Sequence, residues 1–203
     1  MWVIGIVGGV ASGKTRVAEQ FARLGAHIIQ ADLLGHAVLR EREVISQLHV
    51  RWGDGVLKAD GEIDRAAVAR IVFAPSDSGR EELRFLESVT HPRIAQRMSE
   101  KIAEQRALGT VPAVVLDAAI LLEAGWGRLC DRIVYVDVAR AERLARAGQR
   151  GWSEAEFAAR EASQLSLKEK RKVADGVIDN AGSIDHTFAQ VQQFWQSLNL
   201  SRP

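Results

Sequence analysis

GIVGGVASGKTRVAEQ, residues Gly5 to Gln20, is the stretch of this sequence that decides the fold. An apolar run at 2–7 leads into a glycine-rich loop, and apolar residues recur at helical spacing after Lys14. Gly8 and the triplet Gly13-Lys14-Thr15 fit the pattern G-x-x-x-x-G-K-[ST] in a strand, loop, helix context. The N–H groups of such a loop converge on phosphate oxygens, and the helix amino end adds partial positive charge. A phosphate-binding loop is therefore predicted in preference to a ligand-free glycine turn.

Two side chains of the loop and one distant acid indicate a nucleoside triphosphate with Mg²⁺. Lys14 is expected to reach the β- and γ-phosphates, and the Thr15 hydroxyl is expected to ligate Mg²⁺. Asp117, at the end of the apolar run AVVLD, has the placement of an acid that holds Mg²⁺ through water. A strand-end turn acid is the alternative interpretation of Asp117.

Strands and helices are expected to alternate along the rest of the chain. Short apolar runs predict strands at 2–7, 27–29, 111–117, 132–138 and 176–179. Helical patterns lie at 14–24, 33–43, 44–52, 66–73, 81–88, 93–108, 139–149, 153–163 and 184–198, with a break expected at Thr90-His91-Pro92. The alternation predicts an α/β protein with a parallel sheet, helices on both faces and a binding crevice at the carboxyl ends of the strands.

Composition suits one compact domain over residues 1–203. The chain is 47% hydrophobic and 26% charged, which excludes a disordered or fibrous protein. A net charge of +1 gives no bulk attraction to nucleic acid or to an anionic membrane, and no apolar run reaches the ~20 residues of a membrane-spanning helix. The single cysteine, Cys130, excludes an internal disulfide and a zinc cluster. A cytoplasmic protein without a signal peptide is expected.

The use made of the nucleotide has to be read from the rest of the chain, because kinases, GTPase switches and motor ATPases share this loop. The sequence has no Asn-Lys-x-Asp segment to read guanine, and a motor ATPase usually has a longer chain. A small-molecule kinase needs an acid beside its acceptor and arginines that exclude water. Asp32, just past the second predicted strand, would orient an acceptor hydroxyl and take its proton, or would be the N-cap of a helix that begins at Leu33.

Arginines and polar residues later in the chain suit the remaining roles of a kinase. Four arginines recur at helical spacing along one face: Arg140, Arg143, Arg146 and Arg150. They are either lid arginines that close over the phosphates or a solvated face paired with glutamates. The pair Asp179-Asn180 suits either an adenine contact or an Asx turn. His91 either lies near substrate or simply precedes the helix that starts after it.

Several longer blocks, together with the loop, resemble the dephospho-CoA kinase family over nearly the whole chain. The blocks are GIVGGVASGKTRVAEQFARLGAHIIQAD (5–32), GDGVLKADGEIDRAAVARIVF (53–73), THPRI (90–94), VVLDAAILLEAGW (114–126) and QLSLKEKRKVADGVIDNAGS (164–183). The resemblance implies a three-layer α/β/α P-loop kinase fold, a helical CoA-binding insertion at about 40–110 and a lid at about 139–165. It further implies transfer of the γ-phosphoryl group of ATP to the ribose 3′-hydroxyl of dephospho-CoA, the last step of coenzyme A biosynthesis.

The resemblance also implies a role for individual residues. ATP would be bound by Gly9, Ala11, Ser12, Gly13, Lys14, Thr15, Arg16 and Asn180, and Mg²⁺ by Thr15 and Asp117. Dephospho-CoA would be bound by Asp32, His91, Leu121 and Glu123, and the catalytic residues would be Asp32, Lys14, Arg146 and Arg150. The implied partners are these two small molecules, with no nucleic acid or membrane, for a monomer or small homo-oligomer.

Four positions depart from the residues usual in the family. Gln30 replaces an aspartate, Ala11 a glycine, Arg16 a threonine and Ala119 a proline. Gln30 leaves Asp32 as the only acid of its element, and Ala11 costs some backbone freedom but no phosphate contact. Activity is still expected, with its efficiency open. The alternatives are another nucleoside or nucleotide kinase, or a regulatory switch that binds nucleotide and acts through a partner.

Overall fold

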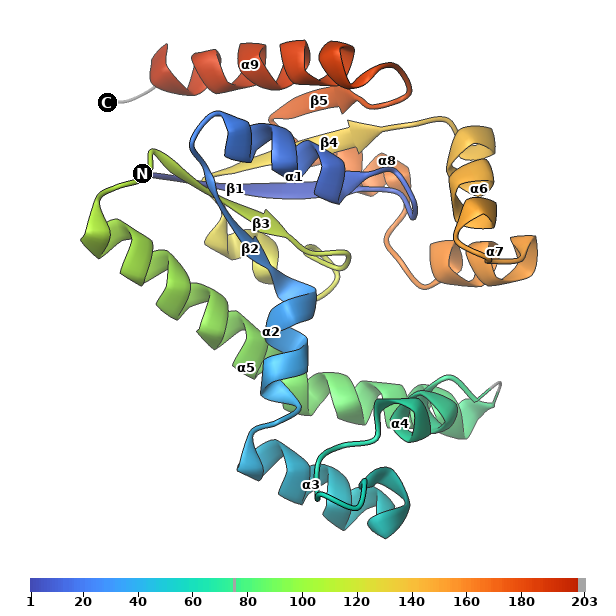
Figure 1. Ribbon diagram of the computed structural model, residues 1–203. Coiled ribbons are helices and arrows are strands. Elements are labelled where there is room, and N and C mark those ends of the chain that lie inside the picture. The colour runs from blue at the N-terminus through green and yellow to red at the C-terminus, as the bar shows by residue number, and fades with distance from the viewer. Residues whose placement is uncertain (75, 201–203) are drawn as a thin grey trace. The chain divides into compact units, whose positions relative to one another are not determined.

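A computed structural model of the chain describes residues 1–74 and 76–200. The chain divides into two compact units, Met1–Gln30 with Lys101–Pro203, and Ala31–Glu100. The first unit carries the sheet, and the second consists of helices and their connections (Figure 1). Among the described residues, every helix is too short or too polar to span a bilayer.

The sheet of the first unit has five strands, all of which were predicted from the sequence. They are β1 (Trp2–Gly8), β2 (His27–Gln30), β3 (Ala113–Asp117), β4 (Arg132–Asp137) and β5 (Gly176–Asp179). All neighbouring strands are parallel, in the order β2-β3-β1-β4-β5. β1 lies at the centre, with β3 and β2 on one side and β4 and β5 on the other, so the strand order reverses beside β1. Ligands of open parallel sheets bind at the carboxyl ends of the strands at such a point.

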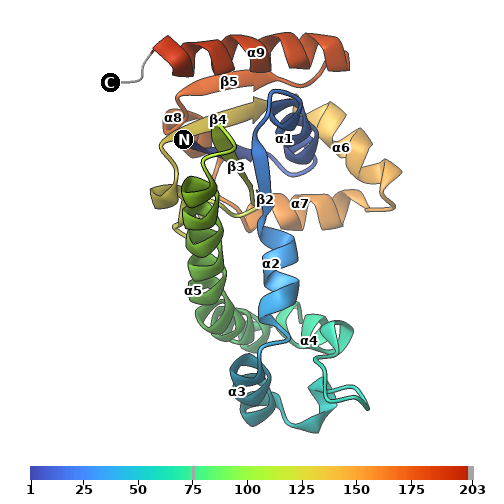
Figure 2. The same ribbon diagram turned by 60° about the vertical axis from the view of Figure 1, so that its left-hand side comes forward.

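Helices flank this sheet, which confirms the expected three-layer α/β/α fold. The helical segments of the first unit are α1 (Lys14–Arg23), η2 (Trp126–Leu129), α6 (Arg140–Gln149), α7 (Glu154–Ala162), α8 (Leu167–Lys172), α9 (Ile184–Leu200) and the end of α5 (Asp77–Leu108). Helices α1 and α9 lie together on one face, where the rings of Phe21 and Phe194 meet edge-on with centroids 6.1 Å apart (Figures 1 and 2). Ile4 and Ile6 of β1 belong to the same buried apolar cluster as Phe21. Because side chains alternate along a strand, Gly5 faces the other layer, where Leu121 is close.

In the described part of the second unit the regular elements are helices, joined by loops that hold one isolated antiparallel bridge between Leu57 and Ile63. Its helices are α2 (Ala31–Val38), α3 (Arg42–Trp52), η1 (Asp54–Val56), α4 (Arg65–Val72) and most of α5. The Asp64 carboxylate caps α4 by accepting hydrogen bonds from the N–H groups of Ala66 and Ala67. The unit covers most of the helical insertion that the sequence placed at about 40–110, and it begins earlier, at Ala31.

The helix break predicted at Thr90-His91-Pro92 is wrong, because α5 is one helix with Pro92 in its interior. A proline inside a helix removes one hydrogen bond and costs about 3 kcal/mol. Packing offsets this cost: apolar residues are buried on both sides of the proline, with Val89 before it and Ile94 and Met98 after it. The Thr90 hydroxyl also donates to the Leu86 carbonyl at 2.8 Å, within the turn before the proline. Tertiary packing therefore decides against the local signal.

Helix α8 was not predicted. Its start carries a capping box in which the Ser166 hydroxyl accepts from the Glu169 N–H and the Glu169 carboxylate accepts from the Ser166 N–H. Helix α7 begins with the same arrangement at Ser153 and Glu156. The tetrapeptide SLKE was visible as a helix start in the sequence, but the six residues of α8 are too few for an apolar period to be recognised.

Candidate nucleotide-binding site

The loop between β1 and α1 leaves the amino end of α1 open. Gly13 is the N-cap of α1, with φ 84° and ψ 33°, and it has no side chain to bond the first N–H groups of the helix. These N–H groups and the helix dipole form a ready site for an anion. Only glycine fits this position, since a Cβ would lie 2.4 Å from the Asn180 amide nitrogen and the backbone is left-handed. The local sequence thus builds a phosphate cradle.

Ala11 is the one residue other than glycine with positive φ in the described part of the chain, at 59°. A residue with a Cβ loses roughly 1–2 kcal/mol in this conformation. The Ala11 methyl group is buried in a small cluster with Val10, Ala147 and Phe157. Burial of one methyl group returns about 0.8 kcal/mol. The cost of an alanine in place of glycine here is therefore partly offset by packing.

The Lys14 ammonium lies on the carbonyls of its own loop, donating to the Gly9 carbonyl at 3.0 Å and the Gly8 carbonyl at 3.3 Å. Burial is the first cause that lowers the pKa of Lys14, to about 8, and the charge of Lys170 is the second. Asp117 and Glu123 act in the opposite direction, and Arg143 adds to the lowering. An anion placed against this ammonium would stabilise its charged form.

Thr15 and Asp117 meet at the mouth of the loop. The Thr15 hydroxyl donates to Asp117 Oδ2 at 2.7 Å. Asp117 is brought there by the sheet, since it ends β3 and pairs in register with Ile6 of the neighbouring β1. A hydroxyl and a carboxylate are the hard oxygen donors that Mg²⁺ prefers, so the residues present fit this ion. The structure brings together the two residues that the sequence proposed as its ligands.

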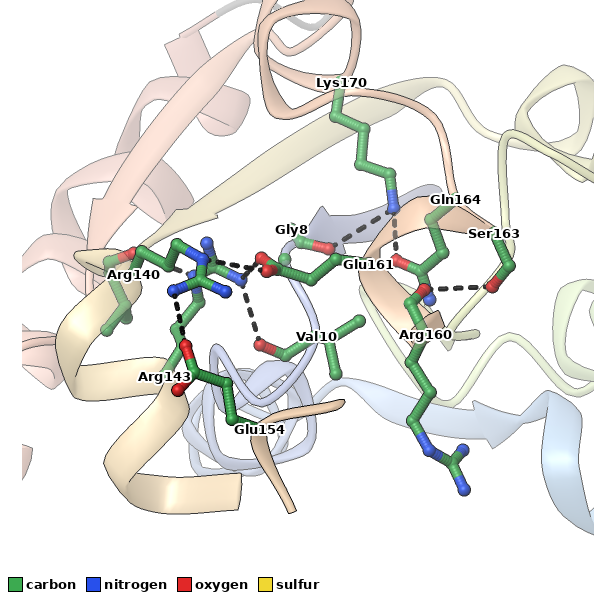
Figure 3. Close-up of polar contacts among 12 residues, drawn as sticks. Gly8, Val10, Arg140, Arg143, Glu154, Arg160, Glu161, Ser163, Gln164 and Lys170 are labelled. Carbon is green, nitrogen blue, oxygen red and sulfur yellow. Dashed lines mark hydrogen bonds and ion pairs between the residues drawn. The ribbon is translucent and has the colours of Figure 1, made fainter. Parts of the chain in front are cut away.

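The carbonyls of the loop are bonded by cations and an amide from late segments of the chain; Figure 3 shows Lys170 at the Gly8 carbonyl and Arg143 at the Val10 carbonyl. The contacts are Lys170 to the Gly8 carbonyl at 3.4 Å, Arg143 to the Val10 carbonyl at 3.3 Å, and Arg146 and Asn180 to the Ser12 carbonyl at 3.2 and 2.8 Å. The Gly8, Val10 and Ser12 carbonyls are thus bonded from outside the loop, whereas the Gly9 carbonyl accepts from the Ser12 N–H at 3.2 Å within it. The Ser12 hydroxyl is buried and has no partner among the described residues.

The arginine stripe of α6 is divided among three environments. Arg143 is buried, with 2% of its surface exposed, and also donates to the Val138 carbonyl at 3.1 Å and to Glu161 at 2.6 Å. Arg146 is half-buried and also donates to the Asn180 carbonyl at 2.6 Å. Arg140 is exposed beside Glu154 and Glu161, as in the solvated-face interpretation. Arg150 is exposed and follows the last residue of α6.

Asn180 is fully buried against the loop. Its side-chain oxygen accepts from the Thr187 hydroxyl at 3.0 Å, which fixes the amide nitrogen toward Ser12. Asp179 makes the Asx turn, because its carboxylate accepts from the Ala181 N–H at 2.9 Å. The pair therefore divides the tasks: Asp179 turns the chain and Asn180 supports the loop.

Four further candidate residues lie in the first unit. Gly9 has no room for a side chain, since a Cβ would be 2.6 Å from Arg143 Nη1. Arg16 is exposed on α1, and Leu121 is buried in the turn after β3. The Glu123 carboxylate accepts from Lys170 at 2.9 Å and from the Leu165 N–H at 3.0 Å, so it is bonded within the protein.

Two candidate residues lie in the second unit. Asp32 is in the first turn of α2, and the helix begins one residue earlier at Ala31, so the N-cap interpretation of Asp32 is wrong. His91 lies within α5, where burial lowers the pKa of its imidazole against the opposing charge of Glu87.

Sequence reasoning missed Lys170, Gln164 and the structural task of Arg143. Lys170 is one of three lysines in the segment LKEKRK, and nothing in the letters says which of them is buried. The capping box of α8 was the available signal, because it sets the helical phase that turns Lys170 inward. For Arg143 the helical spacing was noticed, but a buried arginine cannot be told from a surface one without the fold.

The fold and the loop define a P-loop nucleotide-binding protein: a parallel sheet whose central strand leads into a phosphate cradle with a lysine, a threonine and a strand-end acid in place. The family model described as dephospho-CoA kinase matches residues 2–186. This chain belongs to the dephospho-CoA kinase family.

Individual relatives agree over most of the chain. A dephospho-CoA kinase of Symbiobacterium thermophilum is 40% identical over 200 residues, which cover 97% of this chain and 81% of the relative. A solved structure from Thermus thermophilus has a TM-score of 0.80 at 29% identity, covering 100% of this chain and 98% of the other. The dephospho-CoA kinase structure from Campylobacter jejuni has a TM-score of 0.71 at 25% identity, covering 97% and 96%.

Proposed function

We infer that this protein transfers the γ-phosphoryl group of ATP to the ribose 3′-hydroxyl of dephospho-CoA, giving coenzyme A and ADP. Membership of the dephospho-CoA kinase family gives the reaction. The observation that carries the inference is the pair of side chains at the loop: Lys14 lies on carbonyls of the loop, and Thr15 is bonded to Asp117 at 2.7 Å.

Binding of ATP is assigned to the loop. The N–H groups from Gly9 to Arg16 would hold the phosphates, with the Ser12 hydroxyl free to add a bond. Lys14 would leave its carbonyls for the β- and γ-phosphates and stabilise charge that develops during transfer. Thr15 and Asp117 would hold Mg²⁺, which supplies neutralisation of the phosphate charge when it is bound. Asn180 supports the loop and is also proposed to border the adenine.

Roles on the acceptor side are proposed for residues that the sequence singled out. Asp32 would orient the ribose hydroxyl and receive its proton. Asp32 follows β2 by two residues, and Gln30, the last residue of β2, pairs with Asp117 in register. His91, Leu121 and Glu123 are proposed around dephospho-CoA, and Arg146 and Arg150 are proposed to act on the transferring group from a lid at about 139–165. The helical region is proposed to bind the CoA part of the substrate.

The test is ADP release by the purified protein with Mg·ATP, with and without dephospho-CoA, and a mass measurement of the product. Release that depends on dephospho-CoA, with one phosphate added to it, is expected. ADP release that ignores dephospho-CoA but responds to another nucleoside would move the protein to a different acceptor. Tight ATP binding with no acceptor at all would indicate a regulatory switch.

Two further properties stay predictions. The cytoplasmic location is inferred from the single cysteine, which suits a reducing compartment. Burial and the charge of Asp131 raise the pKa of its thiol to about 12, as suits an unreactive cysteine. The oligomeric state, monomer or small homo-oligomer, is open to a direct measurement of mass in solution.

A further inference from the structure

Lys170 is a buried cation at the phosphate-binding loop to which the proposed reaction gives no task. Only 2% of its surface is exposed. Its ammonium donates to Gln164 Oε1 at 2.8 Å and, at the longer distance of 3.4 Å, to the Gly8 carbonyl (Figure 3). It also donates to Glu123 Oε1 at 2.9 Å. The three N–H bonds of the ammonium thus have three acceptors from separate parts of the chain. Lys170 would have to give up these bonds to bind a phosphate itself, so a direct catalytic role is disfavoured.

Lys14 and Lys170 share one acceptor. The Gly8 carbonyl lies 3.3 Å from the Lys14 ammonium and 3.4 Å from the Lys170 ammonium. Like charges this close repel each other, and burial strengthens the repulsion. Lys170 is accordingly the largest electrostatic cause of the lowered pKa of Lys14, ahead of Asp117, Glu123 and Arg143, which are the other charged groups that act on Lys14.

The two lysines differ in their freedom. In the described part of the chain, the Lys14 ammonium donates to two backbone carbonyls, both from its own loop. Lys170 is held by Glu123, which also accepts from the Leu165 N–H at 3.0 Å, and by Gln164, both outside the loop. An incoming phosphate can therefore draw Lys14 away while Lys170 keeps its place.

We propose that Lys170 is a positioning residue for Lys14 in the kinase reaction. It stays on the Gly8 carbonyl when Lys14 turns to the nucleotide phosphates, so the carbonyl keeps a donor. Its charge also makes the place of Lys14 on the loop carbonyls unfavourable, so that Lys14 transfers readily to the nucleotide. The inference rests on the proposed function only for the identity of the reaction, since nucleotide binding alone engages both lysines.

The test compares Lys170→Met, Lys170→Arg and the matched control Lys172→Met, which removes an exposed lysine of the same helix. The affinity for Mg·ATP is measured by calorimetry without acceptor, and kcat and KM for ATP are measured at neutral pH. In Lys170→Met we expect affinity about tenfold weaker, because the Gly8 carbonyl loses the donor that remains when Lys14 turns to the phosphates. Lys170→Arg should keep the affinity near that of wild type, because its guanidinium can still donate to this carbonyl, and Lys172→Met should match wild type.

A purely structural role would give a different result. If Lys170→Met lowers thermal stability but keeps the Mg·ATP affinity of the Lys172→Met control, the proposal is wrong. If Lys170→Met does not fold, the double variant Lys170→Met with Glu123→Gln removes both partners of the ion pair. Its affinity should still be about tenfold weaker, because the Gly8 carbonyl lacks the same donor, and unchanged affinity overturns the proposal. Normal Mg·ATP binding without phosphorylation of dephospho-CoA would contradict the proposed function and leave this test readable.

Discussion

Cations are used in opposite ways in the two units. In the first unit, Arg143 and Lys170 are 2% exposed and donate to backbone carbonyls of the phosphate-binding loop. In the second unit, Arg97 is bonded to Glu41 and Glu100 with 49% of its side chain exposed. Exposed ion pairs contribute about 0–1 kcal/mol to stability, whereas removal of one partner of a buried pair costs about 3–5 kcal/mol. Burial rather than the number of charge pairs therefore marks the residues on which the site depends.

The sharpest test of this contrast is at Lys14. Lys14→Met removes the cation that would stabilise the transferring phosphoryl group, and we expect kcat/KM for ATP to fall by about 10²–10³-fold or more. Steady-state ADP release measures the effect, with Lys172→Met as the exposed control. A variant that keeps a tenth of wild-type kcat/KM would show that the loop lysine is not the main source of charge stabilisation.

Next in size is the effect of Arg143 on stability. Arg143→Met leaves the Val10 and Val138 carbonyls without this donor and Glu161 with only its exposed partner Arg140, so we expect a loss of about 2–4 kcal/mol in unfolding free energy. Urea denaturation measures it. The control is Arg140→Met, whose side chain is 51% exposed and pairs with the same Glu161, and which should lose less than about 1 kcal/mol. Equal losses in the two variants would remove burial as the deciding factor.

A pH profile sharpens the comparison without any substitution. The pKa of Lys14 is lowered to about 8, so its charge is present below that pH and is lost as pH rises through it. We expect kcat/KM for ATP to fall by up to about tenfold per pH unit above this point, because kcat/KM reports groups of the free enzyme. The profile is measured with saturating acceptor. Constant kcat/KM up to the ordinary pKa of lysine would mean that its surroundings do not desolvate Lys14.

The smallest effect is expected in the second unit. Arg97→Gln breaks the pairs with Glu41 and Glu100, but both partners stay exposed to water or near Arg93, which also pairs with Glu41. Unfolding free energy should therefore fall by less than about 1 kcal/mol, as measured by denaturant titration. A loss of 2 kcal/mol or more would mean that surface pairs of the second unit act as a cooperative network.

Much of the first unit could be predicted from the sequence, because its inner strands β1, β3 and β4 are largely buried and read as continuous apolar runs such as AVVLD and RIVYVD. The loop was equally plain, since Gly13, Lys14 and Thr15 are required by local backbone geometry and phosphate chemistry. Asp117 could be placed because a strand end fixes the position of the next side chain.

Two kinds of feature lay beyond the sequence. The continuous helix through Pro92 depends on apolar contacts of Val89, Ile94 and Met98 that a local pattern does not weigh against the proline. Which cations bond the loop depends on which of several similar side chains turns inward. Lys170 turns inward, while the other two lysines of LKEKRK are exposed. Such choices are made by long-range packing between segments more than 130 residues apart, as between Val10 and Arg143.

The loop carbonyls held by late segments have a consequence for synthesis of the chain. Residues 8–13 leave the ribosome early, but the side chains that hold their carbonyls follow at Arg143, Arg146, Lys170 and Asn180, and the Asn180 amide is oriented by Thr187. A nascent chain emerges from its N-terminus at about 5–20 residues per second. During synthesis the phosphate-binding loop therefore lacks these contacts for several seconds. The contact from Asn180 can form only after β5, which it follows, has been made.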